Sequence, residues 1–515
     1  MTFDIKAPLF HDLVRLHGKW LPDKAALIDD TKTVTWKTLD ERSSQVANGL
    51  HVLGIGRGNC VAVLMSNCAE YVEIMYGVLK AGAVIVPLNV AVQDDGLVGM
   101  LRDSDARAVF YSPDQFARLT GRHGDLPDGT RHFVFGADDP LPGTDDYEAW
   151  RDACSDAEPG IEIGDDDPCN IIYSSGTTGL PKGITHLYRR RIQSMYELSL
   201  AHRYHFDAVS ICAIGLYSSI AWGSLFCSLL VGGTCVIRDK FDPGLWVGTV
   251  EEYGVTHTFM APIMFQRVLD HEDFRPESVA SLQAVISGGA PLYESLKKRI
   301  AENFGCVVIE LYGLTEGFMT TLQPGDADGR LTSVGKPVRG NDLILVDVDD
   351  NEVGFGGTGE ICVRSVHWMT GYHNRPEATM EAEYIDSRGV KWLRTGDIGR
   401  TDAEGFLYIT DRKKDMIISG GQNIYPIDIE AVLIDHPMVS EIAVIGVPDE
   451  TWGETPIAIV VPRSGATADT AEEILTWANA RLGKRQRIKR VVLQADMPRN
   501  PNGKVLKREL RMTYI

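Results

Sequence analysis

The chain has 515 residues, of which 44% are hydrophobic and 24% are charged. At about 150 residues per domain, this length predicts roughly two to four folding units, and the composition excludes disordered, collagen-like and coiled-coil chains. The 51 basic and 71 acidic residues give a formal net charge of −20, which repels phosphate backbones. We therefore expect no nucleic-acid partner and no general binding to anionic membranes. Any anionic ligand must meet a local basic pocket.

Cysteine usage and the chain ends predict a reducing compartment. The 9 cysteines are scattered without a C-x-x-C pair, unlike a disulfide framework or a zinc site. Asp4 interrupts the start of the chain before any long apolar core, so we expect neither a signal peptide nor a transit segment. No apolar run reaches the roughly 18 residues of a membrane-spanning helix, and the last residues differ from the Ser-Lys-Leu peroxisomal signal. These features predict a cytoplasmic protein without a transmembrane segment.

Residues from about 30 to 111 alternate between helical and strand-like patterns. Thr38 and Glu41 have the spacing of a capping box, and Gly54 supplies a helix stop. The strand-like runs are 60–65, 84–88 and 108–111. Because helical patterns separate these runs, we predict parallel strands joined by crossover helices, and hence an α/β architecture.

The pattern changes twice toward the C-terminus. Between about 340 and 410, short β-rich runs such as 343–348 and 359–363 are broken by Gly and Asp, which predicts a small β subdomain. After Asp411 a compact unit begins, with strand-like runs at 443–447 and 457–461 and a helix near 472–482. We therefore predict a large N-terminal domain over residues 1–411 and a small α+β domain over 412–515.

The most informative segment is Ile171-Ile-Tyr-Ser-Ser-Gly-Thr-Thr-Gly-Leu-Pro-Lys-Gly183, a short apolar strand that runs into a loop rich in Ser, Thr and Gly. Such a loop can hold phosphate, because its glycines allow close backbone approach and its hydroxyls and lysine donate hydrogen bonds. The residues with these roles are Ser174, Ser175, Gly176, Thr177, Thr178 and Lys182. The loop is not a Walker A motif, and the alternative is an ordinary Ser/Gly surface turn. The run Gly54-Ile-Gly-Arg-Gly58 lacks the third glycine of a dinucleotide fingerprint and is interpreted as a helix-to-strand turn.

This loop resembles the signature loop of the adenylate-forming (AMP-binding) superfamily, in its acyl-CoA synthetase branch. Five further blocks are similar to that family's motifs and occur in the family's order: 287–292, 312–316, 392–397, 411–426 and 498–506. The resemblance spans nearly the whole chain. It implies a large α/β N-terminal domain with a small β subdomain, followed by a mobile C-terminal domain.

The resemblance assigns each nucleotide contact to a residue. Backbone at Gly288, Gly289, Ala290 and Pro291 would line the adenine, and Tyr312 with Gly313 would cover the other side of the base. Thr315 would contact the α-phosphate, and Glu316 would hold Mg²⁺ on the phosphates of ATP, since this hard cation prefers carboxylate oxygens. Asp397 would accept hydrogen bonds from the ribose hydroxyls, and Arg412 would donate to the ribose and phosphate region.

Lys504 is the residue we expect to carry the chemistry. Its ammonium would bridge the attacking carboxylate and the α-phosphate, two anions that otherwise repel each other. Outside this context, Gly503-Lys504 would be a basic loop near a flexible end. By the resemblance, Lys414 is the hinge, and rotation of the C-terminal domain would bring the loop of Gly420, Gly421 and Asn423 to the pantetheine thiol of coenzyme A. The basic run 484–490 either meets the phosphates of coenzyme A or is a solvated helix end.

The activity implied is that of an ATP-dependent acid:CoA ligase with a small-molecule carboxylic acid as substrate. The alternatives are adenylation with transfer to a carrier protein or another acceptor, and a non-catalytic binder of acyl-adenylate. Histidines that the family often carries are replaced by Tyr188 and Ser218. By the same alignment Ile220, Trp222 and Ser224 approach the acid, with Phe318 and Met319 as walls, although ordinary core packing explains these residues equally well. The absence of a charged residue among them favours a mostly apolar acid, medium-chain or aryl. The oligomeric state stays open between a monomer and a homodimer.

Overall fold

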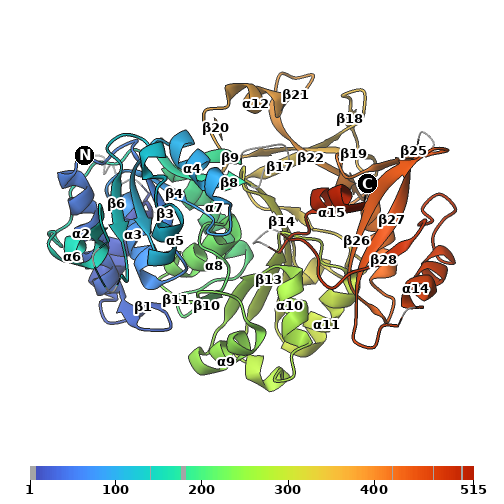
Figure 1. The fold of residues 1–515 in the computed structure, drawn as a ribbon, viewed down its shortest axis with the longest axis horizontal. Helices are drawn as coiled ribbons and strands as arrows, with labels where there is room; N and C mark the ends of the chain where they lie inside the picture. The colour runs from blue at the N-terminus through green and yellow to red at the C-terminus, as the bar shows by residue number, and fades with distance from the viewer. Residues whose placement is uncertain are drawn as a thin grey trace.

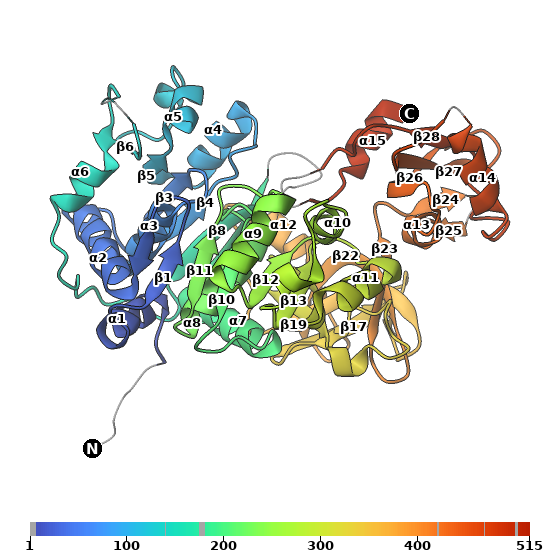
Figure 2. The same ribbon diagram turned by 90° about the horizontal axis from the view of Figure 1, so that it is seen from below.

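The computed structural model describes residues 7–137, 139, 141–174, 181–419, 422–467, 469–499 and 503–514. In this part of the chain, the strands form four β-sheets, and helices pack against them (Figures 1 and 2). Figure 2 shows the C-terminal unit, in red, at one end of the larger N-terminal region. The predicted fold class, a large α/β region with a β subdomain and a smaller α+β unit, is confirmed. None of the described helices is long and apolar enough to cross a membrane.

The eight-stranded sheet contains the first predicted strands, in the order β20-β9-β8-β4-β3-β5-β6-β7. Strand β3 pairs in parallel with both β4 and β5, so the predicted crossover arrangement is confirmed. Strands β3 and β4 and residues 108–111 of β5 are continuous apolar runs, because both faces of the sheet are covered by helices. The strands are β3 (Cys60–Leu64), β4 (Val84–Pro87), β5 (Ala106–Tyr111), β6 (Arg131–Val134), β7 (Asp145–Asp146), β8 (Pro168–Ser174), β9 (Lys182–Leu187) and β20 (Gly371–Tyr372). The helices are α2 (Trp36–Val52), α3 (Ala69–Lys80), α4 (Asp94–Asp103), α5 (Pro113–Arg118), η1 (His123–Asp125) and α6 (Tyr147–Asp152).

Helix α2 begins earlier than the capping-box pattern predicted. Its N-cap is Thr35, whose side-chain oxygen accepts a hydrogen bond from the backbone N–H of Thr38 at 3.2 Å. Thr38 therefore lies within the first turn, and its prediction as the cap is wrong. The physical reason is that Thr35 ends strand β2, so its extended backbone suits the N-cap position.

The nine-stranded sheet has the order β16-β15-β14-β13-β12-β10-β11-β1-β2. Strands β10 to β14 are parallel, so the carboxyl ends of β13 and β14 lie side by side. Open α/β sheets bind ligands at such ends. The strands are β1 (Ala25–Ile28), β2 (Thr33–Thr35), β10 (Val209–Cys212), β11 (Thr234–Ile237), β12 (His257–Met260), β13 (Ala284–Gly288), β14 (Val307–Leu314), β15 (Phe318–Leu322) and β16 (Lys336–Pro337). The helices are α1 (Phe10–Trp20), α7 (Tyr188–Ala201), α8 (Ser219–Leu230), α9 (Pro243–Tyr253), α10 (Pro262–Leu269), η2 (Pro276–Val279), α11 (Glu294–Phe304) and η3 (Pro324–Asp326).

The β subdomain follows as a six-stranded sheet. Its order is β18-β17-β19-β22-β21, and β23 also pairs with β22. These pairings are antiparallel, which accounts for the short runs broken by turn residues in the sequence. Its elements are β17 (Asn341–Val346), β18 (Glu352–Val353), β19 (Thr358–Ser365), α12 (Pro376–Glu381), β21 (Glu383–Ile385), β22 (Lys391–Thr401) and β23 (Leu407–Arg412).

The C-terminal unit has a sheet of its own, in the order β25-β24-β27-β26, with β28 on β27. The chain leaves the β subdomain at Arg412 and enters this sheet at Ile417, next to the predicted domain boundary. Separate apolar clusters lie on the two faces of the sheet, so the unit has its own core. Its elements are β24 (Ile417–Ser419), β25 (Gln422–Ile424), α13 (Pro426–Leu433), β26 (Val439–Asp449), β27 (Gly453–Pro462), α14 (Thr470–Asn479), β28 (Val491–Leu493) and α15 (Lys507–Tyr514).

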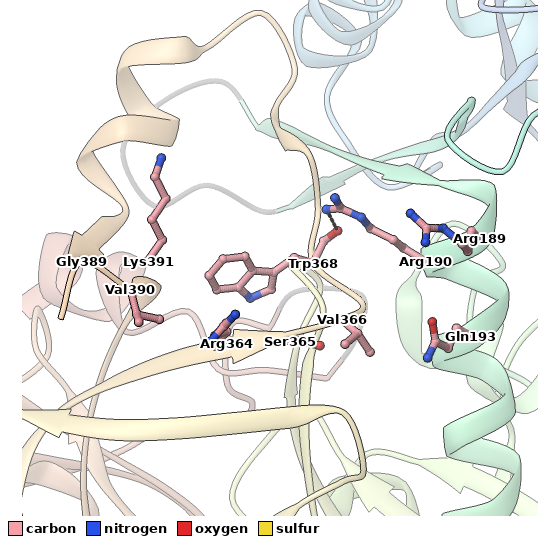
Figure 3. Close-up of a pocket in the computed structure, with 10 residues that line it drawn as sticks. All are labelled: Arg189, Arg190, Gln193, Arg364, Ser365, Val366, Trp368, Gly389, Val390 and Lys391. Atoms are coloured by element: carbon pink, nitrogen blue, oxygen red, sulfur yellow. Dashed lines mark hydrogen bonds between the residues drawn. The ribbon is translucent and has the colours of Figure 1, made fainter. Parts of the chain in front are cut away.

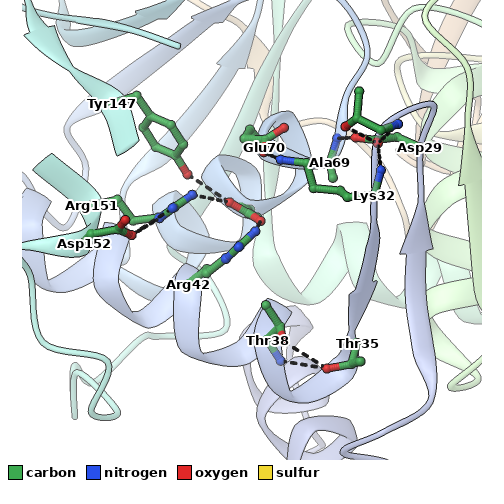
Figure 4. Close-up of polar contacts among 12 residues, drawn as sticks. Asp29, Lys32, Thr35, Thr38, Arg42, Ala69, Glu70, Tyr147, Arg151 and Asp152 are labelled. Carbon is green, nitrogen blue, oxygen red and sulfur yellow. Dashed lines mark hydrogen bonds and ion pairs between the residues drawn. The ribbon is translucent and has the colours of Figure 1, made fainter. Parts of the chain in front are cut away.

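A buried ionic network joins the helices of the N-terminal region (Figure 4). The carboxylate of Glu73 on α3 is fully buried. It accepts hydrogen bonds from Arg42 Nη1 at 2.7 Å and from Arg151 Nη1 at 3.1 Å, and Tyr147 OH lies at 3.3 Å. Because a buried charge is costly without partners, these contacts fix α2, α3 and α6 relative to one another.

Candidate active site

A cavity of about 1060 Å³ lies where the nine-stranded sheet, the β subdomain and the C-terminal unit meet. We call it the nucleotide cleft. Its lining includes predicted nucleotide contacts from distant parts of the sequence. They are Gly289, Ala290, Pro291, Tyr312, Gly313, Asp397, Arg412 and Lys504.

The glycines at the end of β13 allow the backbone to line one wall of the cleft. Gly288 is the last residue of β13, and a Cβ there would lie 2.9 Å from the carbonyl oxygen of Leu311. Gly289 has φ +84°, and a Cβ there would lie 2.6 Å from Ile220 Cδ1. Only glycine fits this backbone without strain. Tyr312 lies on the neighbouring strand β14, which extends to Leu314 and pairs with β15.

Asp397 lies at the centre of the polar wall. It faces Arg412 across the β22–β23 pair, with Arg412 Nε 3.3 Å from Asp397 Oδ1. Tyr312 OH donates a hydrogen bond to Asp397 Oδ2 at 2.7 Å. Burial, together with Asp397, raises the pKa of Tyr312 well above its ordinary value, so the phenol keeps its proton and remains a donor. The Asp397 carboxylate is thus held as an acceptor for hydroxyl groups.

The ends of β8 and β9, which flank the predicted phosphate loop in the sequence, lie near a second group of polar side chains. Ser174 and Lys182 face each other at the end of the β8–β9 hairpin, whereas Ser175, Gly176, Thr177 and Thr178 lie outside the described residues. The ammonium of Lys182 lies 4.6 Å from the ring centroid of Tyr372. Tyr372 OH in turn donates to Glu316 Oε1 at 3.0 Å. These contacts bring Lys182 and Glu316 to one place, joined by a tyrosine that the sequence analysis missed.

Tyr372 could not have been found from a local signal. It lies in a two-residue strand, β20, that pairs with β9. Its position relative to Glu316 depends on that pairing, which joins segments far apart in the sequence. The spacing of residues within a motif, which predicted the other site residues, cannot predict a contact of this kind.

Glu316 is a partly buried residue whose carboxyl group lies beside Tyr372. Burial raises the pKa of its carboxyl group, so a nearby positive charge would favour the ionised form. No group of three or more metal-ligating side chains occurs among the described residues. A single carboxylate is compatible with Mg²⁺, which usually keeps several waters and binds through one or two carboxylates and substrate phosphates. The neighbouring Thr315 hydroxyl lies 3.4 Å from Ser219 Oγ at the start of α8.

Lys504 reaches the cleft from the C-terminal unit. Gly503 lies so close to the N-terminal region that a Cβ there would be 3.2 Å from Ile263 Cγ2. Arg499 donates to the carbonyl oxygen of Gly503 and also pairs with Glu441 on β26, which holds the loop in place. Burial, with Arg412 and Lys414 nearby, lowers the pKa of Lys504 to about 7, although Asp397 opposes this shift. Lys504 therefore lies close to Asp397 and Arg412, and an anion bound beside it would favour its protonated form.

A hydrogen-bonded bridge docks the C-terminal unit in this position. Glu430 on α13 accepts a hydrogen bond from Tyr293 OH of the N-terminal region at 3.1 Å. Its other oxygen lies 2.7 Å from Lys507 Nζ, three residues after Lys504. Gln266 Nε2 adds a contact of 3.1 Å to the carbonyl oxygen of Ser440. The bridge therefore links the N-terminal region to the helix that follows Lys504.

One residue predicted to approach coenzyme A, Asn423, does not line the nucleotide cleft. Asn423 is exposed on β25, where it pairs with Ile418 in the C-terminal sheet. Gly420 and Gly421 lie outside the described residues. Lys414 is exposed in the turn between β23 and β24 and comes near Lys504. Lys414 likewise does not line the nucleotide cleft.

The residues expected near the acid separate into two groups. Ile220 lies against Gly289, beside the cleft. Trp222 faces the core instead, since its Nε1 donates to the carbonyl oxygen of Leu216 at 2.8 Å and its ring lies 4.6 Å from the guanidinium of Arg191. Ser224, Phe318 and Met319 are also buried. Tyr188 is anchored by its hydroxyl to the carbonyl oxygen of Leu79 at 2.9 Å, and Ser218 caps α8.

Comparison with known proteins agrees with this geometry. Residues 16–373 match the family "AMP-binding enzyme", and residues 428–504 match the "AMP-binding enzyme C-terminal domain". The chain is 34% identical over 504 residues to a feruloyl-CoA synthase of Amycolatopsis sp, covering 96% of each chain. It is 36% identical over 487 residues to the long-chain-fatty-acid–CoA ligase FadD13 of Mycobacterium tuberculosis, covering 93% of each.

A solved structure shares the arrangement of the whole chain. The anthranilate CoA ligase AuaEII, in complex with anthranoyl-AMP, superimposes with a TM-score of 0.91 at 27% identity and covers 98% of both chains. The likeness thus includes both the N-terminal region and the C-terminal unit. On the strength of these matches, the chain belongs to the AMP-binding enzyme family and is an AMP-forming acid–thiol ligase of the acyl-CoA synthetase branch.

Proposed function

We propose that this ligase converts a mostly apolar carboxylic acid, medium-chain or aryl, into its coenzyme A thioester through an acyl-adenylate. The observation that carries the proposal is the presence of Lys504, Asp397 and Arg412 around one cleft, although they come from two domains. Arg412 and Lys504 supply positive charge at this cleft within a chain of net charge −20, which is what two anionic substrates need.

In the first half-reaction, an oxygen of the substrate carboxylate attacks the α-phosphorus of ATP. A new O–P bond forms, and the bond to pyrophosphate breaks. Asp397 accepts hydrogen bonds from the ribose, the Tyr312 ring covers the adenine, and the Lys504 ammonium opposes the repulsion between carboxylate and phosphate. Glu316 is the residue that would hold Mg²⁺, and the metal, when bound, offsets the negative charge on the phosphates.

In the second half-reaction, the thiol of coenzyme A attacks the acyl carbon. A C–S bond forms, the C–O bond to AMP breaks, and the thiol proton is lost. The docked position of the C-terminal unit supports the first step, because it brings Lys504 to the cleft and leaves Asn423 outside it. We infer that a rotation about Lys414 brings the segment of Gly420, Gly421 and Asn423 to the thiol for the second step.

The substrate class rests on the character of the acyl side of the cleft. Ile220 lies against Gly289 there, and Phe318 and Met319 are buried residues of β15. The relatives named above act, by their names, on feruloyl, long-chain fatty and anthranilate groups, all of which carry a large apolar part. An apolar wall favours such acids over amino acids, whose ammonium would need a partner.

The proposal is tested by following the two half-reactions separately. A panel of aliphatic, aryl and arylpropenoic acids is first assayed for pyrophosphate exchange without coenzyme A, and then for thioester formation with free coenzyme A. We expect exchange that requires the acid, and thioester formation with the same acid. Exchange without thioester would indicate another acceptor, such as a carrier protein, and no exchange with any acid would indicate a binder of acyl-adenylate.

The variant Lys504→Ala distinguishes the roles of the two domain positions. We expect it to lower adenylate formation by about 100- to 1000-fold, because one preorganised cationic donor is lost. Thioester formation from supplied acyl-adenylate should stay close to that of the wild type, because Lys504 faces the cleft only in the first step. Equal losses in both half-reactions, measured by stopped flow, would contradict the two-position mechanism.

A further inference from the structure

A second cavity, of about 670 Å³, lies apart from the nucleotide cleft. It is formed by the beginning of α7, the chain around the end of β19 and the start of β22, and Figure 3 shows the side chains of these segments around one space. The described residues that line the two cavities do not overlap. The roles assigned above to the nucleotide cleft therefore leave this cavity unexplained.

The lining of this cavity is basic. Arg189, Arg190, Arg364 and Lys391 line it, and no described lining residue is acidic. Arg189 pairs with Asp166 at 2.9 Å and Lys391 with Glu383 at 2.8 Å, but both cations are more than half exposed, so these pairs are weak and exchangeable. A local excess of cations is therefore maintained within a chain of net charge −20.

Two of the guanidinium groups have no carboxylate partner in the described part of the chain. The guanidinium of Arg190 donates to two main-chain carbonyls, at 2.8 Å to Trp368 and at 3.2 Å to Met369. These bonds fix the Arg190 guanidinium without neutralising its charge. Arg364, on β19, is exposed and makes no ion pair with any residue that the structure describes. Two such cations across one cavity repel each other unless an anion lies between them.

The position of the arginines on α7 departs from the usual distribution of charge on helices. Arg189 and Arg190 lie in the first turn, which contains no acidic residue. The N-terminal end of a helix already carries partial positive charge, so cations there are unfavourable. An anion in the cavity would reverse this effect, because it would meet both side chains and the helix end. Departures of this kind from a local rule occur mainly at functional sites.

Trp368 gives the cavity a flat apolar wall beside the cations. Figure 3 shows its ring between Lys391 and Arg190. The indole Nε1 is buried, and no described residue accepts its hydrogen bond. Guanidinium groups suit phosphate oxygens, and an aromatic face suits a planar ring. The volume lies within the range of small-molecule sites.

We propose that this cavity binds a small soluble ligand that contains a phosphate monoester and a planar ring, as a mononucleotide does. Arg190 and Arg364 hold the phosphate from two sides, and Trp368 contacts the ring. The proposal is independent of the identity of the acid substrate, because no residue of the nucleotide cleft takes part in it.

The test is equilibrium dialysis of radiolabelled AMP against the full chain. Asp397→Asn is used first to weaken AMP binding in the nucleotide cleft, so that the remaining binding reports on the second cavity. We expect this variant to keep one equivalent of bound AMP, with inorganic phosphate as a weaker competitor because it lacks the ring. Adding Arg364→Gln should weaken the remaining binding by about 10- to 100-fold, the effect of losing one charged hydrogen-bonding partner.

Two controls keep the result specific. Arg107→Gln, which removes an exposed arginine on β5, should not change the remaining binding. Arg364→Gln alone should leave pyrophosphate exchange at the wild-type rate, because Arg364 does not line the nucleotide cleft. The proposal is overturned if Asp397→Asn binds no AMP, or if Arg364→Gln leaves the remaining binding unchanged. It is also overturned if Arg364 is needed for sedimentation with phosphatidylcholine–phosphatidic acid vesicles while AMP does not compete, since the cavity would then be a membrane contact.

Discussion

The charge of Lys504 should make the first half-reaction decline as the pH rises. Burial, with Arg412 and Lys414 close by, lowers the pKa of this lysine to about 7 in the protein without substrates. A lowered lysine pKa means that the ammonium is present below about pH 7 and is lost above it. Only the ammonium can bridge the carboxylate and the α-phosphate. The reactive fraction of the free protein therefore falls as Lys504 loses its proton.

The size of the effect follows from the titration of a single group. With a pKa of about 7, the protonated fraction is about 1/11 at pH 8 and about 1/100 at pH 9. The value of kcat/KM for ATP in pyrophosphate exchange should therefore fall about tenfold per pH unit above pH 7, since kcat/KM reports on the free protein. The measurement covers pH 6 to 9 at constant ionic strength, with the acid and ATP both well below their KM values, so that the rate reports on the free protein.

Lys504→Arg is the matched variant for this profile. A guanidinium keeps its charge throughout this pH range, so the activity that the variant retains should not show the alkaline decline. A wild-type profile that is flat from pH 6 to 9 would refute the reasoning. So would a decline of the same size in the wild type and in Lys504→Arg, because another group would then be titrating.

Two further predictions concern contacts that the structure revealed. Tyr293→Phe removes the hydroxyl that joins the N-terminal region to Glu430 at 3.1 Å. We expect adenylate formation to fall about 2- to 10-fold, the effect of one hydrogen bond, while thioester formation from supplied acyl-adenylate is unchanged. Equal losses in the two stopped-flow assays would contradict a docking role. Glu73→Gln leaves Arg42 and Arg151 without their buried counter-charge and should lower the free energy of unfolding by about 3–5 kcal/mol in urea titration. In the control Glu41→Gln, which removes an exposed pair with Lys37 at 3.6 Å, the change should stay below about 0.5 kcal/mol, and similar values for both variants would contradict the role of the network.

Some features of the site could be predicted because they depend on neighbours in the chain. The apolar runs of β3, β4 and residues 108–111 of β5 indicate buried strands, and the structure pairs these strands in parallel. Glycines stand at positions 288 and 289, where a side chain would be too close to its neighbours. In each case the physical cause lies within a few residues, so the pattern of residue types contains it.

Other features could not be predicted, because they depend on how whole elements pair and pack. Thr35 rather than Thr38 caps α2, since Thr35 ends β2, a strand of three residues that is extended where it pairs with β1. Trp222 faces the core because its indole N–H donates to the carbonyl of Leu216 and its ring packs against the guanidinium of Arg191. Side-chain periodicity alone does not distinguish one buried side of a helix from another.

The residues themselves determined that the chain is an acidic α/β protein, and their motifs predicted a phosphate-binding loop and the charged groups of the site. Which of those groups meet was decided by the tertiary structure. The contact of Tyr372 with Glu316, the bridge from Tyr293 through Glu430 to Lys507, and the basic cavity around Arg190 and Arg364 all join separate sheets or domains. Such contacts arise from the packing of whole elements, and a sequence specifies that packing only through the sum of many weak interactions.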